Sequence, residues 1–187
     1  MRSIVPLFAF ALAAAAPAIA AENIPVAAFK NVELRGGGEV VLVPGPTQQV
    51  TILDGSSAYT RFSVEADHRL RIDACNNRCP QHYRLRIEIQ SPTVPGVGVR
   101  GGGSIRAQSG FAPQGNVAAG VDGGGTIDLR AVDGSSVAAG INGGGVIMVR
   151  ARGTLAAGVN GGGEVRYWGN PQVTSAIQGG GLVRRGG

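Results

Sequence analysis

Three aspartates in the second half of the chain are the first candidates for chemistry. Asp122, Asp128 and Asp133, with Glu164, are the acidic residues of residues 94–187. Two carboxylates that flank a glycosidic bond can serve as general acid and as base or nucleophile. Asp122 with Asp128 or Asp133 is therefore the candidate pair for a polysaccharide-cleaving enzyme. The sequence has no G-x-S-x-G elbow, P-loop or H-E-x-x-H motif, so no other catalytic arrangement supports an enzyme.

Arginine supplies nearly all of the positive charge. The chain has 17 Lys and Arg against 12 Asp and Glu, for a formal net charge of +5. The surplus lies in residues 94–187, where a mildly basic face suits an anionic polysaccharide or another surface component. These arginines lack the interleaved aromatic residues of a nucleic-acid platform, so we expect no nucleic-acid partner. The candidate binding residues are Arg106, Arg130, Arg150, Arg166 and Trp168, with Trp168 expected to stack on Arg150.

Cys75 and Cys79 are the only cysteines. In an exported protein two cysteines pair by default, so we predict a disulfide that closes a short loop. A metal site made by these cysteines with His82 and His68 is the alternative, but thiolates in an oxidising compartment pair more often than they bind metal. We therefore expect no metal and no cofactor.

The first twenty residues, MRSIVPLFAFALAAAAPAIA, are typical of a secretory signal peptide. Arg2 precedes a short apolar run, and small residues lead to a cleavage site after Ala20 or Ala21. No later segment is long and apolar enough to span a membrane. We expect an exported protein, in the periplasm, at the cell surface or secreted, with residues 21–187 forming one domain.

Triple glycines punctuate the mature chain at regular intervals. They begin at Gly36, Gly101, Gly123, Gly143, Gly161 and Gly179, and the last four intervals are 22, 20, 18 and 18 residues. Short segments with β-branched residues at every second position flank each triplet, which is a strand pattern. Repetition at this spacing predicts an all-β, single-stranded parallel β-helix, or β-solenoid, with about 18–22 residues per coil and glycine corners. Residues 94–187 would form the regular coils.

Residues 22–93 are less regular and are expected to cap the first coils. At the other end, Arg184 and Arg185 precede only Gly186 and Gly187. Arginines at an open edge discourage strand addition, yet self-association through this open C-terminal coil is a further possibility.

Several of these motifs occur together in one known family. An F-x-x-V-x-L phrase at residues 29–34, a strand RLRIEI at 84–89 and glycine triplets followed by alternating apolar residues resemble the bacterial family called putative auto-transporter adhesin, head GIN domain. The resemblance covers about residues 27–185, although the family usually has G-S-G where this chain has GGG, and CNNRC departs from its pattern. It implies an exported right-handed parallel β-helix with a proposed role in adhesion, and it carries over no catalytic residues.

The sequence therefore predicts a non-enzymatic exported β-solenoid, adhesin-like or envelope-binding, that presents a rigid basic face. The alternatives are a polysaccharide-cleaving β-helix that uses Asp122 and Asp128, and a purely structural self-assembling envelope protein. These three hypotheses require different features: a basic binding face, a pair of carboxylates, and an open coil end that self-associates.

Overall fold

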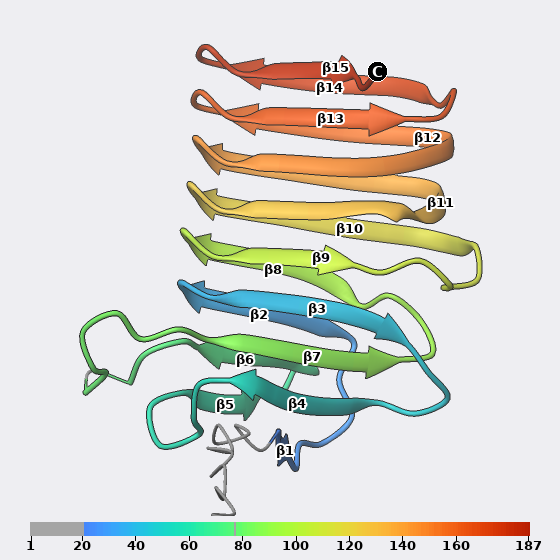
Figure 1. The fold of residues 1–187 in the computed structure, drawn as a ribbon. Helices are drawn as coiled ribbons and strands as arrows, with labels where there is room; N and C mark the ends of the chain where they lie inside the picture. The colour runs from blue at the N-terminus through green and yellow to red at the C-terminus, as the bar shows by residue number, and fades with distance from the viewer. Residues whose placement is uncertain (1–20, 77) are drawn as a thin grey trace, which may run out of the picture.

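The structure, a computed structural model, describes residues 21–76 and 78–187. All fifteen elements of regular structure in these residues are β-strands, and they join into one sheet (Figure 1). The described residues include no helix with the length and apolarity that a membrane span requires. The predicted signal peptide, residues 1–20, lies outside the described residues.

The sheet folds over so that two ladders of strands lie face to face. Ladder A contains the strands that run into the glycine turns, together with β5 (Arg61–Val64) and β6 (Arg69–Asp73), which extend the same ladder. In spatial order these are β5, β6, β2 (Asn31–Gly36), β8 (Gly96–Gly101), β10 (Gln114–Gly123), the second halves of β11 (Thr126–Gly143) and β12 (Val146–Asn160), and β14 (Gln172–Gln178).

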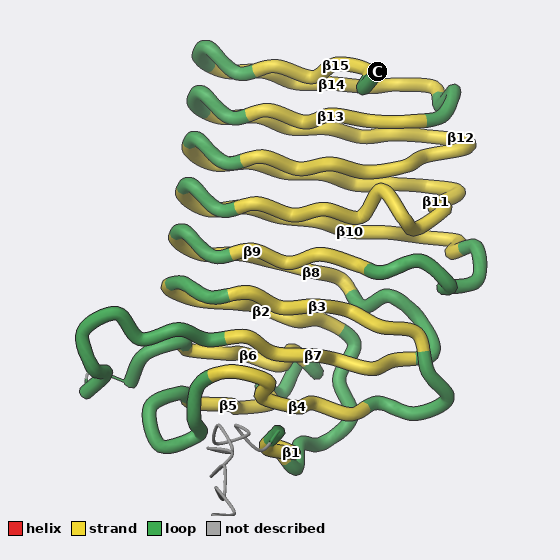
Figure 2. The backbone as a smooth tube through the Cα atoms, viewed as in Figure 1, coloured by secondary structure: helices red, strands yellow, loops and turns green. Residues whose placement is uncertain are grey.

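Ladder B contains the strands that leave the glycine turns, together with β1 (Glu22–Ile24), β4 (Gln49–Asp54) and β7 (Arg86–Ser91), which extend the same ladder. In spatial order these are β1, β4, β7, β3 (Glu39–Pro44), β9 (Ser104–Ala107), the first halves of β11 and β12, β13 (Glu164–Trp168) and β15 (Leu182–Arg185). The long strands β11 and β12 pass from ladder B into ladder A, which is why both ladders belong to one sheet (Figure 2).

The prediction of an all-β chain is confirmed, but the prediction of a single-stranded parallel β-helix, or β-solenoid, is wrong. The chain forms an open, curled sheet, like a half-barrel, in which parallel and antiparallel pairs are mixed. The antiparallel pairs are β1 with β4, β4 with β7, and β5 with β6. The reason lies in the connections: β5 and β6 are joined by a tight turn in which His68 adopts a φ of 58°, and a turn this short can only return the chain antiparallel.

The core lies between the two ladders and is built by side chains at every second strand position. Five of the six apolar residues that lie two positions after a glycine triplet are fully buried, since Val40, Ile105, Ile127, Ile147 and Val165 are each 0% exposed, whereas Val183 in β15 is partly buried. Parallel pairing places Ile127 beside Ile147 and Ile147 beside Val165. Each inner side chain therefore packs on a similar side chain one strand away, with little change in volume along the stack.

The glycine turns show why this residue is needed at some positions. The predicted corner residues Gly36, Gly101, Gly123, Gly143, Gly161 and Gly179 all lie at turns with positive φ, from 91° to 124°. A Cβ on Gly143 would lie 2.6 Å from the carbonyl oxygen of Gly123, and one on Gly145 would lie 2.4 Å from Val121 Cγ1. A Cβ on Gly144 would meet nothing within 4 Å. The first and third glycines of a triplet are thus required by geometry, whereas the second is not.

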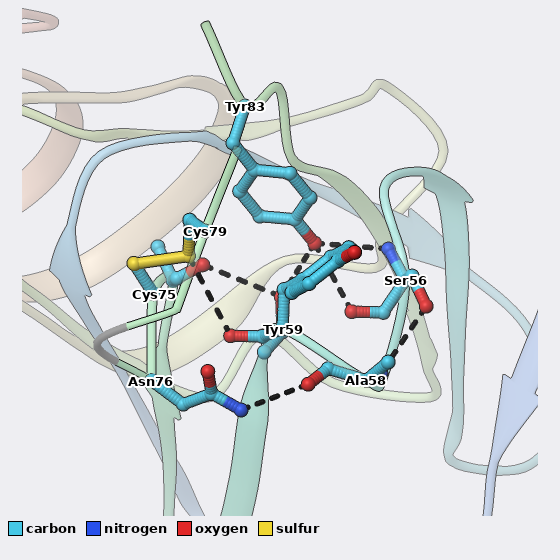
Figure 3. Close-up of a disulfide and its surroundings, with 9 residues drawn as sticks. Ser56, Ala58, Tyr59, Cys75, Asn76, Cys79 and Tyr83 are labelled. Carbon is cyan, nitrogen blue, oxygen red and sulfur yellow. Dashed lines mark hydrogen bonds between the residues drawn. A yellow bond between two sulfur atoms is a disulfide. The ribbon is translucent and has the colours of Figure 1, made fainter. Parts of the chain in front are cut away.

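The predicted disulfide between Cys75 and Cys79 is confirmed (Figure 3). It lies in the connection between β6 and β7, beside a hydrogen-bonded cluster centred on Tyr83. The Tyr83 hydroxyl accepts from the Ser56 amide at 2.9 Å, and Asn76 Nδ2 donates to the Ala58 carbonyl at 2.9 Å. This connection is therefore tied to the segment that precedes β5. Within the described ranges, no group of His, Cys, Asp and Glu side chains is arranged to hold a metal ion.

Candidate functional site

The outer face of ladder B carries the candidate site. Strands β11, β12 and β13 bury alternate residues such as Ile127 and Leu129, so the residues between them point outward. The row of outward positions holds Asp128 beside Met148 and Met148 beside Arg166. The outward residues of these neighbouring strands therefore share one surface.

A bulge in β11 shapes this surface. The partners of Leu129 and Asp133 in β12 are Val149 and Arg150, which are consecutive residues. Residues 130–132 are thus extra on the β11 side, and Figure 2 shows them as a kink in the strand. A bulge bends its strand and redirects the side chains it carries. This one begins at Arg130.

The bulge borders a shallow hollow of about 380 Å³. Its walls combine two arginines, one carboxylate, one aromatic ring and two small apolar side chains: Arg130, Arg150, Asp128, Trp168, Ala107 and Ala131. These residues come from β9, β11, β12 and β13. Side chains contributed by adjacent hydrogen-bonded strands are held at fixed spacing, so the hollow is preformed.

Arg130 connects the groups around the hollow. Its Nε and one terminal nitrogen donate to the two carboxylate oxygens of Asp128 at 2.9 and 2.6 Å. Its guanidinium carbon lies 5.3 Å from the centre of the Trp168 ring, within the range of a cation–π interaction. Its carbonyl oxygen accepts a hydrogen bond from Arg150 Nε at 3.0 Å. Arg130 is therefore positioned by three different neighbours.

Trp168 is held from its other side. Its Nε1 donates to the Gly187 carbonyl at 2.9 Å. The ring covers Gly186, because a Cβ on that residue would lie 2.2 Å from Trp168 Cζ2. The ring is only partly buried, so an apolar surface remains at the rim of the hollow.

The hollow has a net positive charge. Burial disfavours the charged form of Asp128, but hydrogen bonds from Arg130 and the charge of Arg106 hold the pKa of this carboxyl below its ordinary value of 3.8. Asp128 is therefore ionised at neutral pH and compensates Arg130. Arg150 forms a longer contact, 3.9 Å, with Asp133 Oδ1. In the described part of the chain this is its one ion pair, which leaves Arg150 as the less compensated cation of the hollow.

The five predicted binding residues divide into two groups. Arg130, Arg150 and Trp168 line the hollow. Arg106 and Arg166 do not line it, because Arg106 Nε donates to Glu39 at 2.6 Å and Arg166 donates to Glu164 at 2.7 Å. The cation over Trp168 is Arg130, not the expected Arg150, because the bulge carries Arg130 past the intervening strand.

The structure does not bring together the carboxylates of the enzyme hypothesis. Asp122 belongs to the β10 part of ladder A, whereas Asp128 belongs to the β11 part of ladder B. Both side chains point outward, so they lie on opposite faces. The Asp122 carboxylate accepts from Asn142 Nδ2 at 3.3 Å, and Asn142 accepts from Asn160 Nδ2 at 3.4 Å. Asp122 is thus part of a row of side-chain hydrogen bonds across neighbouring strands.

The outer face of ladder A is a second concave surface. Two adjoining troughs of about 730 and 590 Å³ lie there; the first is lined mainly by glycine and alanine, and the second also by a polar row of Asp122, Asn142, Asn160 and Gln178. At one end Glu33, 6% exposed, pairs with Arg35, Arg69 and Arg100. Burial opposes ionisation of Glu33, but these arginines together lower its pKa below the ordinary value. The Glu33 carboxylate is engaged by these arginines, and Asp122, Asn142 and Asn160 are hydrogen-bonded to one another along the second trough.

Sequence reasoning missed two features of the hollow. It did not identify Asp128 as the partner of Arg130, and it did not identify the bulge. A signal for the bulge exists, because successive triplets are 20 residues apart around residues 123–143 and 18 apart around 143–161. The structure has three extra β11 residues, 130–132, and one extra β12 residue between the pairs Gly134/Ala151 and Ser136/Thr154, which gives the net difference of two.

Comparison with one solved structure agrees with this fold. A putative adhesin from Bacteroides fragilis is similar over 88% of this chain and 95% of its own length, with 19% identity and a TM-score of 0.50. Two structures from Parabacteroides distasonis are more distant. A putative adhesin is 17% identical over 89% of this chain and 96% of its own length, with a TM-score of 0.42. A putative lipid binding protein is 16% identical over 90% of this chain and 96% of its own length, with a TM-score of 0.35. No curated protein matches the chain.

A family model identifies the most regular part of the sequence. Residues 114–171, which span β10 to β13, match the model of the family described as putative auto-transporter adhesin, head GIN domain. This segment includes five of the six residues that line the hollow on ladder B, namely Asp128, Arg130, Ala131, Arg150 and Trp168. The comparison therefore confirms that this chain resembles the putative auto-transporter adhesin, head GIN domain family, as its sequence motifs predicted.

Proposed function

We propose that this chain is an exported, non-enzymatic adhesin-like module that binds an anionic polysaccharide of a cell surface or envelope. The observation that carries the proposal is the preformed hollow in which Arg130, Arg150 and Trp168 meet. The family resemblance and the similarity to a putative adhesin support the same class of function. The predicted signal peptide supports export.

The hollow has the groups that an acidic sugar requires. A guanidinium can donate two parallel hydrogen bonds to a carboxylate or sulfate group, and Arg150 is the cation with the weaker internal partner. The exposed part of the Trp168 ring and the methyl groups of Ala107 and Ala131 offer an apolar surface to the C–H groups of a sugar ring. Asp128 holds Arg130 in position, so the ligand need not order that side chain.

Binding to an acidic polysaccharide tests the proposal. We would measure co-sedimentation of the purified, oxidised protein with an insoluble polyuronate and with a neutral glucan, at low salt and at 1 M salt. Specific recognition predicts saturable binding to the polyuronate that partly survives 1 M salt, where the Debye length is only about 3 Å. Loss of all binding at high salt would indicate generic charge attraction and contradict a specific site.

A matched pair of variants locates the binding surface. Arg150→Ser and Arg152→Ser each remove one exposed arginine from β12, but only Arg150 lines the hollow. We expect Arg150→Ser to weaken polyuronate binding by about tenfold or more, the range of a lost charge-assisted hydrogen bond, and Arg152→Ser to change it little. Equal losses in the two variants would show that net charge, and not the hollow, determines binding.

A further inference from the structure

The edge strand β14 is unusual because all seven of its residues are exposed. Within the described chain it pairs only with β12. Its inward-pointing residues Val173 and Ile177 are 40% and 43% exposed. Their register partners in β12, Leu155 and Val159, are 1% and 2% exposed. One further strand against β14 would bury Val173 and Ile177 as β14 itself buries Leu155 and Val159.

The residues of β14 suggest what that further strand is. The sequence QVTSAIQ is nearly symmetric about Ser175. Antiparallel pairing with a second copy of β14 places Ser175 opposite itself and Val173 opposite Ile177 of the other copy. It also places Thr174 opposite Ala176 and Gln172 opposite Gln178. On the inner face two Val173–Ile177 pairs thus flank a small Ser175–Ser175 pair, and polar or small residues meet on the outer face.

We propose that two copies of this chain associate end to end by antiparallel pairing of their β14 strands about a two-fold axis at Ser175. Such a contact is isologous, with the same surface used by both copies, and it closes at two molecules. It satisfies the unpaired backbone groups of both edges at once. The β14 contact uses none of the residues that line the hollow on ladder B.

The neighbouring edge limits the strength of the contact. Strand β15 lies at the same end and carries Arg184 and Arg185. Glu164 compensates Arg184, but the end-to-end arrangement still brings the positive β15 edges of two copies near each other. Salt screens such repulsion. The dimer is therefore expected to tighten as salt rises, opposite to the salt dependence of a polysaccharide held by arginines.

Sedimentation velocity of the purified protein over a wide concentration range, at low and high salt, tests the proposal. We expect a monomer–dimer equilibrium that shifts toward dimer at high salt. Val173→Lys should leave the fold intact, because Val173 is already exposed, and should abolish the dimer by placing a charge in the pairing surface. A monomer at every concentration, or oligomers that grow without limit as in head-to-tail stacking, would overturn the proposal.

Cross-linking distinguishes this geometry from other dimers. In the proposed register, the two copies of residue 175 are directly opposite, with Cβ atoms about 4.5–5.5 Å apart. Ser175→Cys should therefore form an intermolecular disulfide rapidly under mild oxidation. Ser109→Cys, in an exposed loop away from β14, is the control and should cross-link slowly. Equal rates for the two variants would exclude the β14 pairing.

Discussion

The two halves of the molecule are stabilised in different ways. Residues 22–93 contain eight basic and eight acidic side chains, together with the two cysteines. Here individual interactions fix the structure, such as the Cys75–Cys79 disulfide and the ion pairs of Glu33 with Arg35 and Arg69. From β8 onward the strands are parallel and in register, and like residues pack on like residues. The same architecture can therefore be stabilised by specific side-chain partners or by the in-register packing of repeated residues.

The two ends of the stack differ for the same reason. At the N-terminal end, β5 pairs antiparallel with β6, and β1 with β4, so local hairpins and short strands cover the last parallel pairs. At the C-terminal end, β14 and β15 continue the parallel ladders with no such cover in the described chain. Repetition gives each strand a ready partner on both sides, and the last strand of the series retains an open edge.

The largest expected effect comes from the centre of the repetitive half. Ile147→Ala removes a side chain that is 0% exposed, and we expect the free energy of unfolding to fall by about 2–5 kcal/mol. Ile177→Ala, at the open end, is the matched control and should cost less than about 1 kcal/mol. Urea unfolding at low micromolar concentration measures both. Similar losses would show that the final strand is as well packed as the centre.

The glycine turns provide the next comparison. Gly143→Ala forces a residue with a side chain into a φ of 124° and places its Cβ against the Gly123 carbonyl. The backbone conformation alone should cost about 1–3 kcal/mol. Gly144→Ala, one residue later, should be nearly neutral, because its Cβ meets nothing within 4 Å. Thermal unfolding of the two variants would test the turn geometry, and equal melting temperatures would contradict it.

Removal of the disulfide tests how much this bond stabilises the irregular half, residues 22–93. The bond joins cysteines four residues apart, so it restricts only a short loop, and loop-closure entropy predicts a loss of about 2 kcal/mol or less in the Cys75→Ser/Cys79→Ser variant. A reducing agent should lower the stability of the wild-type protein and leave the variant unchanged. Hydrogen exchange should show the loss near β5 and β6. A loss spread evenly over β10 to β13 would contradict the separation of the two halves.

The smallest expected effect concerns an exposed ion pair near the open end. Hydrogen bonds from Arg166 and Arg184 lower the pKa of Glu164 from an ordinary 4.5 to about 2. A carboxyl with a lowered pKa in the folded state stabilises the fold above its unfolded pKa and loses that contribution as pH falls toward the folded value. The stability advantage of wild type over Glu164→Gln should thus disappear between about pH 4.5 and pH 2. An advantage that persists at pH 2 would exclude this ionisation as its source.

The sequence is a good guide where the chain repeats. Alternating residues such as Ile127 and Leu129 indicate inward and outward positions, and export predicts that Cys75 and Cys79 pair. The sequence is a poor guide to strand direction in the first half. The turn before β6 uses Asp67 and His68, which carry no strong hairpin signal, so the antiparallel pairs that overturned the predicted β-helix were not foreseen.

The site was predicted in part for the same physical reason. Register along the stack predicts which residues share a row, and this brought Arg150 and Trp168 to the same surface. It cannot predict a departure from register. Arg130 reaches Trp168 only because β11 bulges, and the choice of Asp128 as its partner depends on that local geometry. Side-chain contacts across two strands lie beyond what periodicity can specify.

The bulge in β11 also has a consequence for how such a surface can diversify. Insertion of residues at the passage from ladder B to ladder A leaves the register of Ile127 with Ile147, and of Ile141 with Val159, unchanged. The added length appears only on the outside, where it alters the hollow. Insertions and deletions at this passage can therefore give related chains different surfaces on an identical core, much as loops do in folds whose strands are joined by long connections.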